Sequence, residues 1–522
     1  MGTITVTRNT ATAIVAPHHD VPTYIVQAGG QGSRMEHYTW NKPKCLVPLD
    51  GKPLLYHLLD RAPDSQFIVI GDYLFDVLKS YLEKFPPSAR VALVRSSGKG
   101  TCSGIAEALS LVEDPASPVG LVWCDLLLEQ LPDFELSNRP LIGLSSHFPC
   151  RWSFDPKRGL AEEMSFDCGV AGYFVFPNAS FLRDVPQNGE FVRWMQQSFS
   201  DFDTVRLERC TEVGNSAVAM RQWEKRGYAR FFNDVSMQEH CVVKRARIPG
   251  LAHKIEEEAD WYAEAARRGF ANIPAMLERS PLTLSRIDGK HPDELNLKPI
   301  EKHALLEKIF GTLTTLHGLG EKPADLIDCS ETYISKTIMR VAKILSLVPH
   351  HNEPFFTINS KRCRNPFGDG GDLEALVGAI ACDGFRFFHG DPTFANTLVT
   401  DSKEVFLIDP RVMFGKTKFF GDPDYDWAKL YYSAIGDYDA FNRRRFRLVV
   451  WDRTVSLDID SAGFSFTKSM FREHLGEARM RKVELLHALI WLSLAGWVDD
   501  DVDSMLGAFF NGLYWLEDWA SA

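Results

Sequence analysis

Two groups of residues in this sequence have the types and spacing that phosphate chemistry needs. The first group follows the short apolar run TYIV and consists of Gln27, Ala28, Gly29, Gly30, Gly32, Ser33 and Arg34. Its glycines let the backbone turn tightly and aim N–H groups at phosphate oxygens, and Arg34 adds a forked cation. In the nearby run NKPK, Pro43 favours an extended loop from which Lys44 can meet a second phosphate. A glycine turn alone is often only a turn, but the added cations favour a phosphate site.

The second group lies in the run HGDPTFAN, whose pattern is HGDxxxxN. Asp391 and Asn396 are five residues apart, and Asp409 follows thirteen residues later in VFLIDPR. In a phosphoryl-transfer site one aspartate orients an alcohol and accepts its proton, while an amide and a second aspartate hold magnesium on the ATP phosphates. We therefore expect Asp391 to be the catalytic base, and Asn396 and Asp409 to be magnesium ligands.

The elements around the first group predict an α/β domain over residues 22–225. Apolar runs of strand length follow Thr23 at 67–73, 90–97, 120–127, 140–146 and 169–176, and helical patterns at 52–62 and 74–85 lie between them. Strands that alternate with helices are typical of a parallel-rich sheet. Residues 1–21 form a polar leader without the apolar core of a signal peptide.

The elements around the second group predict another domain over residues 226–522. The runs ARFFNDVSM and HCVVKRARI are typical of neighbouring antiparallel strands, and residues 254–269 form a strong helical pattern. Helical patterns dominate beyond about residue 300, interrupted by two predicted hairpins at 388–415. We expect a small lobe at about 226–295 and a helical lobe at about 296–522.

Composition narrows the classes of partner. The chain has 522 residues, with 58 Lys and Arg against 69 Asp and Glu, so its formal net charge is -11. An acidic chain is poorly suited to wrapping nucleic acid. Its ten cysteines form no CxxC pair, and no apolar run is long enough to span a membrane. We expect a cytoplasmic protein with reduced thiols, and we leave homo-oligomerisation open.

The first group and its surroundings, YIVQAGGQGSRM followed by NKPKCLVPLDGKPLL, resemble the signature of the sugar-phosphate and choline-phosphate nucleotidyltransferases. The resemblance covers roughly residues 22–225. It implies a Rossmann-like fold with a mixed, mainly parallel sheet and a nucleotide held by the glycine turn. It also implies catalytic roles for Arg34 and Lys44, which would neutralise charge on the triphosphate.

The same resemblance extends to three later places in the chain. Gly100 and Thr101, in GKGT, resemble the loop that meets the base and ribose. Asp125 stands where the family has its first magnesium carboxylate, and Glu212 resembles the second, although the family usually has Asp there. The chain also departs from the family at Gln27, which replaces an apolar residue, and at Ser33, which replaces Thr.

The second group resembles the aminoglycoside phosphotransferase and choline kinase family, a branch of the bilobal, α+β protein-kinase-like fold. The resemblance implies that Lys244 binds the ATP phosphates and that Glu258 is its ion-pair partner, with Glu256 and Glu257 as neighbouring alternatives. In GDPDYDWAKL it implies that Asp426 braces the catalytic loop through backbone N–H groups. No GxGxxG loop precedes Lys244, which favours a small alcohol over a protein as substrate.

The aromatic-rich end of the chain permits two interpretations. Aromatic faces can cage a quaternary ammonium group, but at helical spacing such residues more often fill a core. The residues concerned are Trp491, Trp497, Phe509, Phe510, Tyr514, Trp515 and Trp519.

Together the two resemblances predict a bifunctional, magnesium-dependent enzyme. ATP would phosphorylate a small alcohol or sugar, and a second nucleoside triphosphate, with CTP favoured, would then transfer its nucleotidyl group to that phosphate. The product would be an activated precursor for envelope or capsule glycans. Two alternatives stay open: uncoupled activities on a sugar 1-phosphate with UTP or GTP, and a nucleotide-sensing module without turnover. The alcohol is not specified by any motif.

Overall fold

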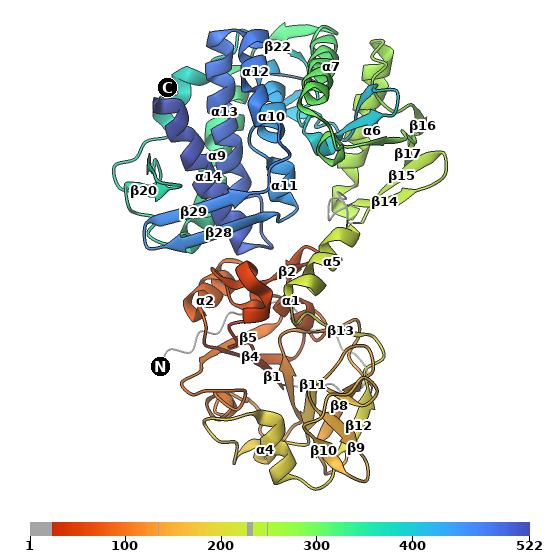
Figure 1. Ribbon diagram of the computed structural model, residues 1–522, viewed down its shortest axis with the longest axis vertical. Helices are drawn as coiled ribbons and strands as arrows, with labels where there is room; N and C mark the ends of the chain where they lie inside the picture. The colour runs from red at the N-terminus through yellow and green to blue at the C-terminus, as the bar shows by residue number, and fades with distance from the viewer. Residues whose placement is uncertain (1–22, 134, 227–232, 248, 522) are drawn as a thin grey trace. The chain divides into compact units, whose positions relative to one another are not determined.

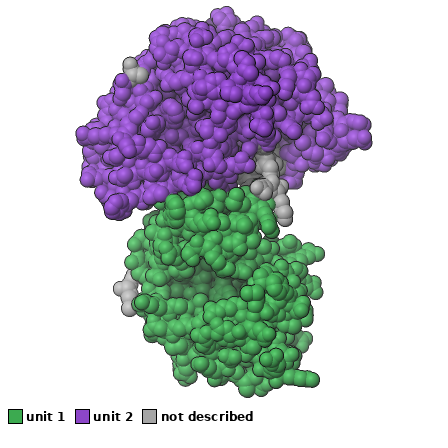
Figure 2. Space-filling model, in the orientation of Figure 1, with its two compact units in different colours: residues 1–225, 499–503 green, residues 226–498, 504–522 purple. Residues whose placement is uncertain are grey.

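The computed structural model describes residues 23–133, 135–226, 233–247 and 249–521, and the predicted leader lies outside these residues. The chain divides into two compact units, coloured separately in Figure 2. Unit 1 contains residues 1–225 and 499–503, and unit 2 contains residues 226–498 and 504–522. The five residues 499–503 therefore cluster with unit 1, whereas the sequence placed them in the C-terminal domain.

Unit 1 is built on a nine-stranded mixed sheet (Figure 1). Its centre has the order β5-β4-β1-β6, and these four strands are all parallel. Strand β11 pairs antiparallel with both β6 and β8, and β12 pairs parallel with β8. The strands are β1 Thr23–Gln27, β4 Gln66–Gly71, β5 Arg90–Arg95, β6 Val119–Trp123, β8 Leu141–Ser145, β9 Ser153–Asp155, β10 Gly159–Ala161, β11 Gly169–Phe176 and β12 Asp203–Arg206.

The apolar side chains of β1 suit its position in the centre of the sheet. Its apolar residues Tyr24, Ile25 and Val26 are each at most 2% exposed, as expected for a parallel strand covered on both faces. One core cluster joins β1 and its neighbours to the helix that carries Phe191 and Met195. The helices of unit 1 are α1 Leu54–Leu59, α2 Phe75–Lys84, α3 Ile105–Leu109, α4 Phe191–Ser198 and α5 Ser216–Arg226, and two small sheets pair β2 Pro48–Leu49 with β3 Lys52–Pro53 and β7 Leu126–Leu128 with β13 Cys210–Glu212.

Unit 2 begins with a four-stranded antiparallel sheet in the order β14-β15-β17-β16, against which α6 packs. A second four-stranded sheet and several smaller sheets follow, and helices make up most of the rest. The strands of the first sheet are β14 Asn233–Met237, β15 Cys241–Ala246, β16 Met276–Glu278 and β17 Leu282–Ser285. The later strands are β18 Gly289–Lys290, β19 Glu321–Pro323, β20 Phe355–Ile358, β21 Lys361–Arg364, β22 Gly384–Phe387, β23 Thr397–Thr400, β24 Val405–Leu407, β25 Met413–Phe414, β26 Thr417–Lys418, β27 Phe420–Gly421, β28 Phe446–Trp451 and β29 Thr454–Ile459.

The helical core of unit 2 is formed where α13 packs against α9 and α10 (Figure 1). Helix α10 is buried along almost its whole length, including its charged residues Asp424, Asp426 and Lys429. The helices are α6 Ala252–Arg267, α7 Pro299–His317, α8 Leu326–Ser330, α9 Lys336–Ile344, α10 Pro423–Ala434, α11 Tyr438–Asn442, α12 Lys468–Leu475, α13 Glu477–Ala495 and α14 Val502–Ser521.

The predicted α/β fold of the first region is confirmed, including its mixed sheet with a parallel centre. The second region contains several small sheets and many helices. The sequence indicated its first sheet, hairpins and helices but not the sheet of β20, β21, β28 and β29, and the kinase-like fold stays a prediction. Trp491, Phe509 and Phe510 are fully buried, so the core interpretation is correct for these three aromatic residues. All ten cysteines are free thiols. No helix in the described part of the chain is long and apolar enough to cross a membrane.

Candidate functional site

The glycine turn of unit 1 follows β1 directly, at the carboxyl end of the parallel strands. The Ala28 N–H donates to the Ile70 carbonyl oxygen at 2.9 Å, which ties the start of the turn to β4. Gly32 has a φ of +67°, and a Cβ there would lie 3.0 Å from the Cβ of Lys44. A Cβ on Gly30, in contrast, would meet no atom within 4 Å. The turn therefore packs closely against Lys44 but leaves open space above Gly30, as a bound phosphate requires.

Four charged side chains from distant parts of the sequence meet beside this turn. Lys44 Nζ lies 2.5 Å from Asp125 Oδ2, and Arg34 Nη2 lies 3.4 Å from Glu212 Oε1. The backbone enforces this meeting, because β7 pairs with β13 and the Val213 N–H donates to the Asp125 carbonyl oxygen at 2.9 Å. The structure thus brings together all four residues that the sequence singled out for catalysis and metal binding in this region.

The electrostatics of this group are those of a carboxylate pair. Burial raises the pKa of Glu212, and the nearby charge of Asp125 raises it further, although Arg34 and Lys44 oppose the shift. Two like charges in one partly buried site favour a bound cation. Mg²⁺ is commonly held by one or two carboxylates together with substrate phosphates, and this donor set fits Asp125 and Glu212. No cluster of three or more His, Cys, Asp or Glu side chains suited to a metal occurs among the described residues.

The loop predicted to meet the base and ribose is held by hydrogen bonds within unit 1. Gln27 Nε2 donates to the carbonyl oxygens of Thr101, at 2.7 Å, and Ser103, at 3.2 Å. The Thr101 hydroxyl accepts a hydrogen bond from the Phe191 N–H at 2.8 Å. Gly100 has a φ of +86°, and a Cβ there would lie 2.3 Å from the Gly189 carbonyl oxygen. The side chain of Gln27 thus positions the loop, a role that explains a polar residue at the end of a buried strand.

Lys42 is a site neighbour whose partners the sequence analysis missed. Its side chain is 1% exposed, and its Nζ pairs with Asp501, at 3.0 Å, and with Asp503. Asn41 Nδ2 also donates to Asp503 Oδ1 at 3.0 Å. Burial alone would lower the pKa of Lys42, but the two carboxylates raise it above its ordinary value. The acidic run DDDVD at 499–503 was the only feature of the sequence that could have indicated this cluster, and it lies more than 450 residues after Lys42.

The second candidate site lies in unit 2 and begins with a buried lysine. Lys244, on β15, is 6% exposed, and its Nζ lies 2.6 Å from Glu258 Oε1 on α6 and also contacts Asp409. Burial lowers the pKa of Lys244, but Asp409 and Glu258 outweigh burial and raise it above its ordinary value. Of the three adjacent glutamates, Glu258 is therefore the one that pairs with the lysine.

The HGDxxxxN segment runs beside the segment that carries Asp409. The Ile408 N–H donates to the Asn396 carbonyl oxygen at 2.9 Å, and the Arg411 N–H donates to the His389 carbonyl oxygen at 2.7 Å. Asn396 Nδ2 donates to the Asp391 carbonyl oxygen at 2.8 Å, which leaves the Asn396 side-chain oxygen as a candidate ligand. An amide oxygen and a carboxylate, completed by ATP phosphates, are a donor set that suits Mg²⁺.

The carboxylate of Asp391 forms ion pairs with two cations that the sequence analysis did not select as site residues. Arg411 Nη2 lies 3.0 Å from Asp391 Oδ2, and Lys429 Nζ lies 3.0 Å from Asp391 Oδ1. Asp391 is 6% exposed and Lys429 is 7% exposed. Arg411 lies two residues after Asp409 in the run DPR, and Lys429 lies in the run DWAKL. Their positions inside or beside these two motifs were the only indication in the sequence that they belong to the site.

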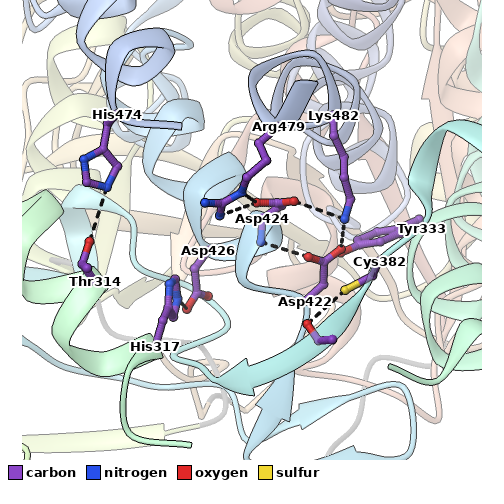
Figure 3. A network of polar contacts seen from close by, with 11 residues as sticks. Thr314, His317, Tyr333, Cys382, Asp422, Asp424, Asp426, His474, Arg479 and Lys482 are labelled. Carbon is purple, nitrogen blue, oxygen red and sulfur yellow. Dashed lines mark hydrogen bonds and ion pairs between the residues drawn. The ribbon is translucent and has the colours of Figure 1, made fainter. Parts of the chain in front are cut away.

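Asp426 holds the backbone at the start of this segment. It accepts hydrogen bonds from the N–H groups of His389, at 2.8 Å, and Gly390, at 2.7 Å, and the ring Nε2 of His317 lies 3.0 Å from it. The predicted bracing role of Asp426 is confirmed. Figure 3 shows that the neighbouring carboxylates face a separate set of partners: Asp422 is bonded to Tyr333 and Lys482, and Asp424 to Arg479 and Lys482.

Residues 24–131 match the family described as "MobA-like NTP transferase domain". Unit 1 therefore contains a nucleotidyltransferase domain, as the sequence resemblance predicted, and the substrate class of such a domain is a nucleoside triphosphate.

Two curated relatives match shorter stretches. UTP--glucose-1-phosphate uridylyltransferase AglF of Haloferax volcanii is 30% identical over 93 residues, which are 17% of this chain and 37% of the relative. CTP:phosphoglutamine cytidylyltransferase of Campylobacter jejuni is 41% identical over 64 residues, which are 12% of this chain and 25% of the relative. The chain thus spans well under half the length of the curated relatives it matches.

Two matching solved structures show a distant likeness. HddC from Yersinia pseudotuberculosis, complexed with GMP-PN, has 18% identity and a TM-score of 0.33, with 39% of this chain and 98% of that chain covered. The inositol-1-phosphate CTP transferase from T. maritima has 15% identity and a TM-score of 0.30, with 38% and 90% covered. TM-scores this low do not bear on function.

Proposed function

We propose that this chain is a bifunctional enzyme with a nucleotidyltransferase site in unit 1 and a small-molecule kinase site in unit 2. The kinase site phosphorylates a small alcohol or sugar with ATP, and the transferase site joins a nucleotide to the resulting phosphate monoester. One observation carries the proposal: each unit has its own group of neighbouring cations and carboxylates, of the kinds that bind phosphates and magnesium. These groups are Lys44, Arg34, Asp125 and Glu212 in unit 1, and Lys244, Glu258, Asp391, Asn396 and Asp409 in unit 2.

In the transferase reaction an oxygen of the phosphate monoester attacks the α-phosphorus of a nucleoside triphosphate. A phosphorus–oxygen bond forms there, the bond to the β-phosphate breaks, and pyrophosphate leaves. Lys44 and Arg34 neutralise charge on the reacting phosphates, and the glycine turn binds the triphosphate through backbone N–H groups. Bound to Asp125 and Glu212, Mg²⁺ would supply further charge neutralisation. Positioning and charge suffice for this reaction, because it needs no covalent help from the protein.

The choice of nucleotide rests on the relatives. The relative with the higher identity, 41%, is by name a CTP-dependent cytidylyltransferase, which supports CTP. The other is by name a UTP-dependent uridylyltransferase acting on glucose 1-phosphate, which favours the alternative of UTP with a sugar 1-phosphate. We propose CTP as the preferred nucleotide and a phosphate monoester destined for envelope or capsule glycans as its acceptor.

In the kinase reaction the hydroxyl oxygen of the acceptor attacks the γ-phosphorus of ATP. The bond from this phosphorus to the bridging oxygen breaks, ADP leaves, and the hydroxyl proton passes to the carboxylate of Asp391. Lys244 binds the ATP phosphates while Glu258 fixes its position, as their 2.6 Å ion pair supports. Asn396 and Asp409 fit the role of magnesium ligands on the same phosphates.

A pyrophosphate-release assay on the full chain tests the coupled function. The chain is incubated with each of the four nucleoside triphosphates and a panel of phosphate esters, or with the free alcohols plus ATP. We expect CTP to release pyrophosphate with a supplied phosphate ester and equally with its free alcohol plus ATP, and we expect EDTA to stop both reactions.

Each other result points elsewhere. Release with UTP and a sugar 1-phosphate, without any effect of ATP, supports the uncoupled alternative. Release only with added phosphate ester removes the kinase half of the proposal. Nucleotide binding without turnover by either unit supports a sensing module and contradicts the enzyme proposal.

A further inference from the structure

A cavity in unit 2 opens beside Asp391. Its empty space, including the part open to solvent, is about 540 Å³. Its walls come from α9, α10, α13 and the segment after Asp409. Arg411 and Lys429 line the cavity. Each of them forms an ion pair with the carboxylate of Asp391, with a nitrogen–oxygen distance of 3.0 Å. The cavity therefore adjoins the group to which the proposed function assigns the acceptor's proton.

The lining of this cavity carries an excess of positive charge. Lys336 and Arg340 of α9 join Arg411 and Lys429, and the cavity lining contains no Asp or Glu among the described residues. The carboxylate of Asp391 offsets only part of this charge. Within the described residues, no ion pair links Lys336 or Arg340 to a carboxylate. Burial lowers the pKa of Lys336 to about 8, and Arg340, Arg411 and Lys429 contribute to the shift.

Aromatic side chains of the cavity already hold cations of the protein itself. The Arg340 guanidinium lies 4.9 Å from the ring centre of Trp497, and Arg340 Nη1 donates to the Ser493 hydroxyl at 2.9 Å. Lys429 Nζ lies 5.3 Å from the ring centre of Tyr432 and 5.8 Å from that of Tyr425. A ligand with a quaternary ammonium group would meet occupied rings and uncompensated positive charge. The geometry thus opposes a choline-like acceptor.

We infer that the acceptor alcohol of the unit 2 site carries its own negative charge, as a carboxylate or a phosphate group. This inference rests on the proposed kinase function and names its substrate class. Lys336 and Arg340 bind the anionic group, and Asp391 receives the proton of the hydroxyl that attacks the γ-phosphorus of ATP as ADP leaves. The four cations of the cavity lose part of their hydration because they are packed close together. A bound anion would compensate for this loss by accepting charge-assisted hydrogen bonds from them.

The test uses the full chain and small alcohols of different charge: glycerol, glycerate and glycerol 3-phosphate, with choline as the cationic member. Binding is measured by calorimetry in the presence of ADP and magnesium, and turnover by ADP release from ATP. We expect the carboxylate or the phosphate compound to bind at least tenfold more tightly than glycerol, and the two compounds separate these two sources of charge. Equal binding of glycerol, or tighter binding of choline, overturns the inference.

Matched variants locate the anion site. Lys336→Met and Arg340→Met should each weaken binding of the anionic alcohol by about tenfold to a hundredfold, because each removes a charged hydrogen-bond donor. Lys343→Met, on the same helix but outside the cavity, should leave it unchanged. Unchanged binding in both cavity variants, with unchanged thermal unfolding, contradicts the inference. Anion binding that these variants abolish, without ADP release from any alcohol, upholds the anion site and refutes the kinase function.

Discussion

The two candidate sites both gather cations and carboxylates for phosphate chemistry, but they differ in how far the charges are already neutralised and buried. In unit 1 the side chains of Arg34 and Glu212 are 68% and 28% exposed, and they stand 3.4 Å apart. In unit 2 the side chains of Lys244 and Glu258 are only 7% and 10% exposed, at 2.6 Å. The first site thus combines this open pair with the mostly buried Lys44–Asp125 pair, whose side chains are 9% and 19% exposed, whereas the Lys244–Glu258 pair of the second site is buried on both sides.

This difference separates catalytic from structural effects of substitution. An exposed ion pair contributes little to the free energy of unfolding, so substitutions in the open pair of unit 1 affect chemistry more than stability. Removing one member of a buried pair leaves the other charge uncompensated, which is strongly destabilising. Variants in the two units can therefore be used to test whether each site works by itself.

The largest expected effect is that of Asp391→Asn in unit 2. The amide keeps the shape of the side chain but cannot accept the proton of the acceptor hydroxyl. ADP release should fall about 100-fold to 10,000-fold, while pyrophosphate release from supplied phosphate ester stays unchanged. Asp401→Asn, an exposed change in the neighbouring hairpin, is the control and should alter neither rate. Loss of both activities in a folded Asp391→Asn protein would contradict two separate sites.

A large loss of stability is expected from Lys42→Met in unit 1. The substitution leaves Asp501 and Asp503 buried without their common cation, at a cost of about 3–5 kcal/mol in the free energy of unfolding. Urea denaturation measures this cost. Lys52→Met is the matched control, because Lys52 pairs with Asp60 in an exposed ion pair worth less than about 1 kcal/mol. Equal costs for the two variants would mean that the buried cluster does not stabilise unit 1.

Asp125→Asn should show the catalytic pattern opposite to that of Asp391→Asn. Pyrophosphate release should fall about 100-fold to 1,000-fold, because charge stabilisation at the reacting phosphates is reduced, and ADP release should not change. Asp64→Asn, an exposed change in a turn of unit 1, serves as the control. Normal pyrophosphate release in the Asp125→Asn variant would show that Asp125 takes no part in the transferase reaction.

The smallest expected effect concerns acid stability in the core of unit 2. His487 is fully buried, neither ring nitrogen has a hydrogen-bond partner among the described residues, and burial lowers its pKa to about 3. The unfolded chain therefore binds a proton at this residue below about pH 6.5, whereas the folded chain does so only near pH 3. As the pH falls through that window, the free energy of unfolding should decrease by about 1.4 kcal/mol per pH unit from this group.

His487→Phe should remove that part of the pH slope, as measured by urea unfolding at pH 6 and pH 4.5. The effect of the substitution at pH 7 serves as the baseline, because there both states of the wild-type residue are mainly neutral. An identical slope in wild type and variant would show that His487 does not contribute to the acid sensitivity of unit 2.

The amino-acid sequence by itself determined the local features of both units. The apolar runs gave the strands of the central sheet, since a parallel strand such as β1 is buried along its length and must be apolar. The pattern GDPDYDWAKL correctly indicated that Asp426 braces the HGD backbone. Such features involve short segments whose residue types carry the signal.

Only the tertiary structure decided which distant charges meet. Lys42 and Asp503 are separated by 461 positions, and nothing in the spacing of either segment specifies the other. The four cations of the unit 2 cavity come from separate segments, two on α9, one after Asp409 and one on α10, so their common charge emerges only when these segments pack together. Packing brings these residues side by side, and electrostatic interactions depend on distance in space, not on separation along the chain.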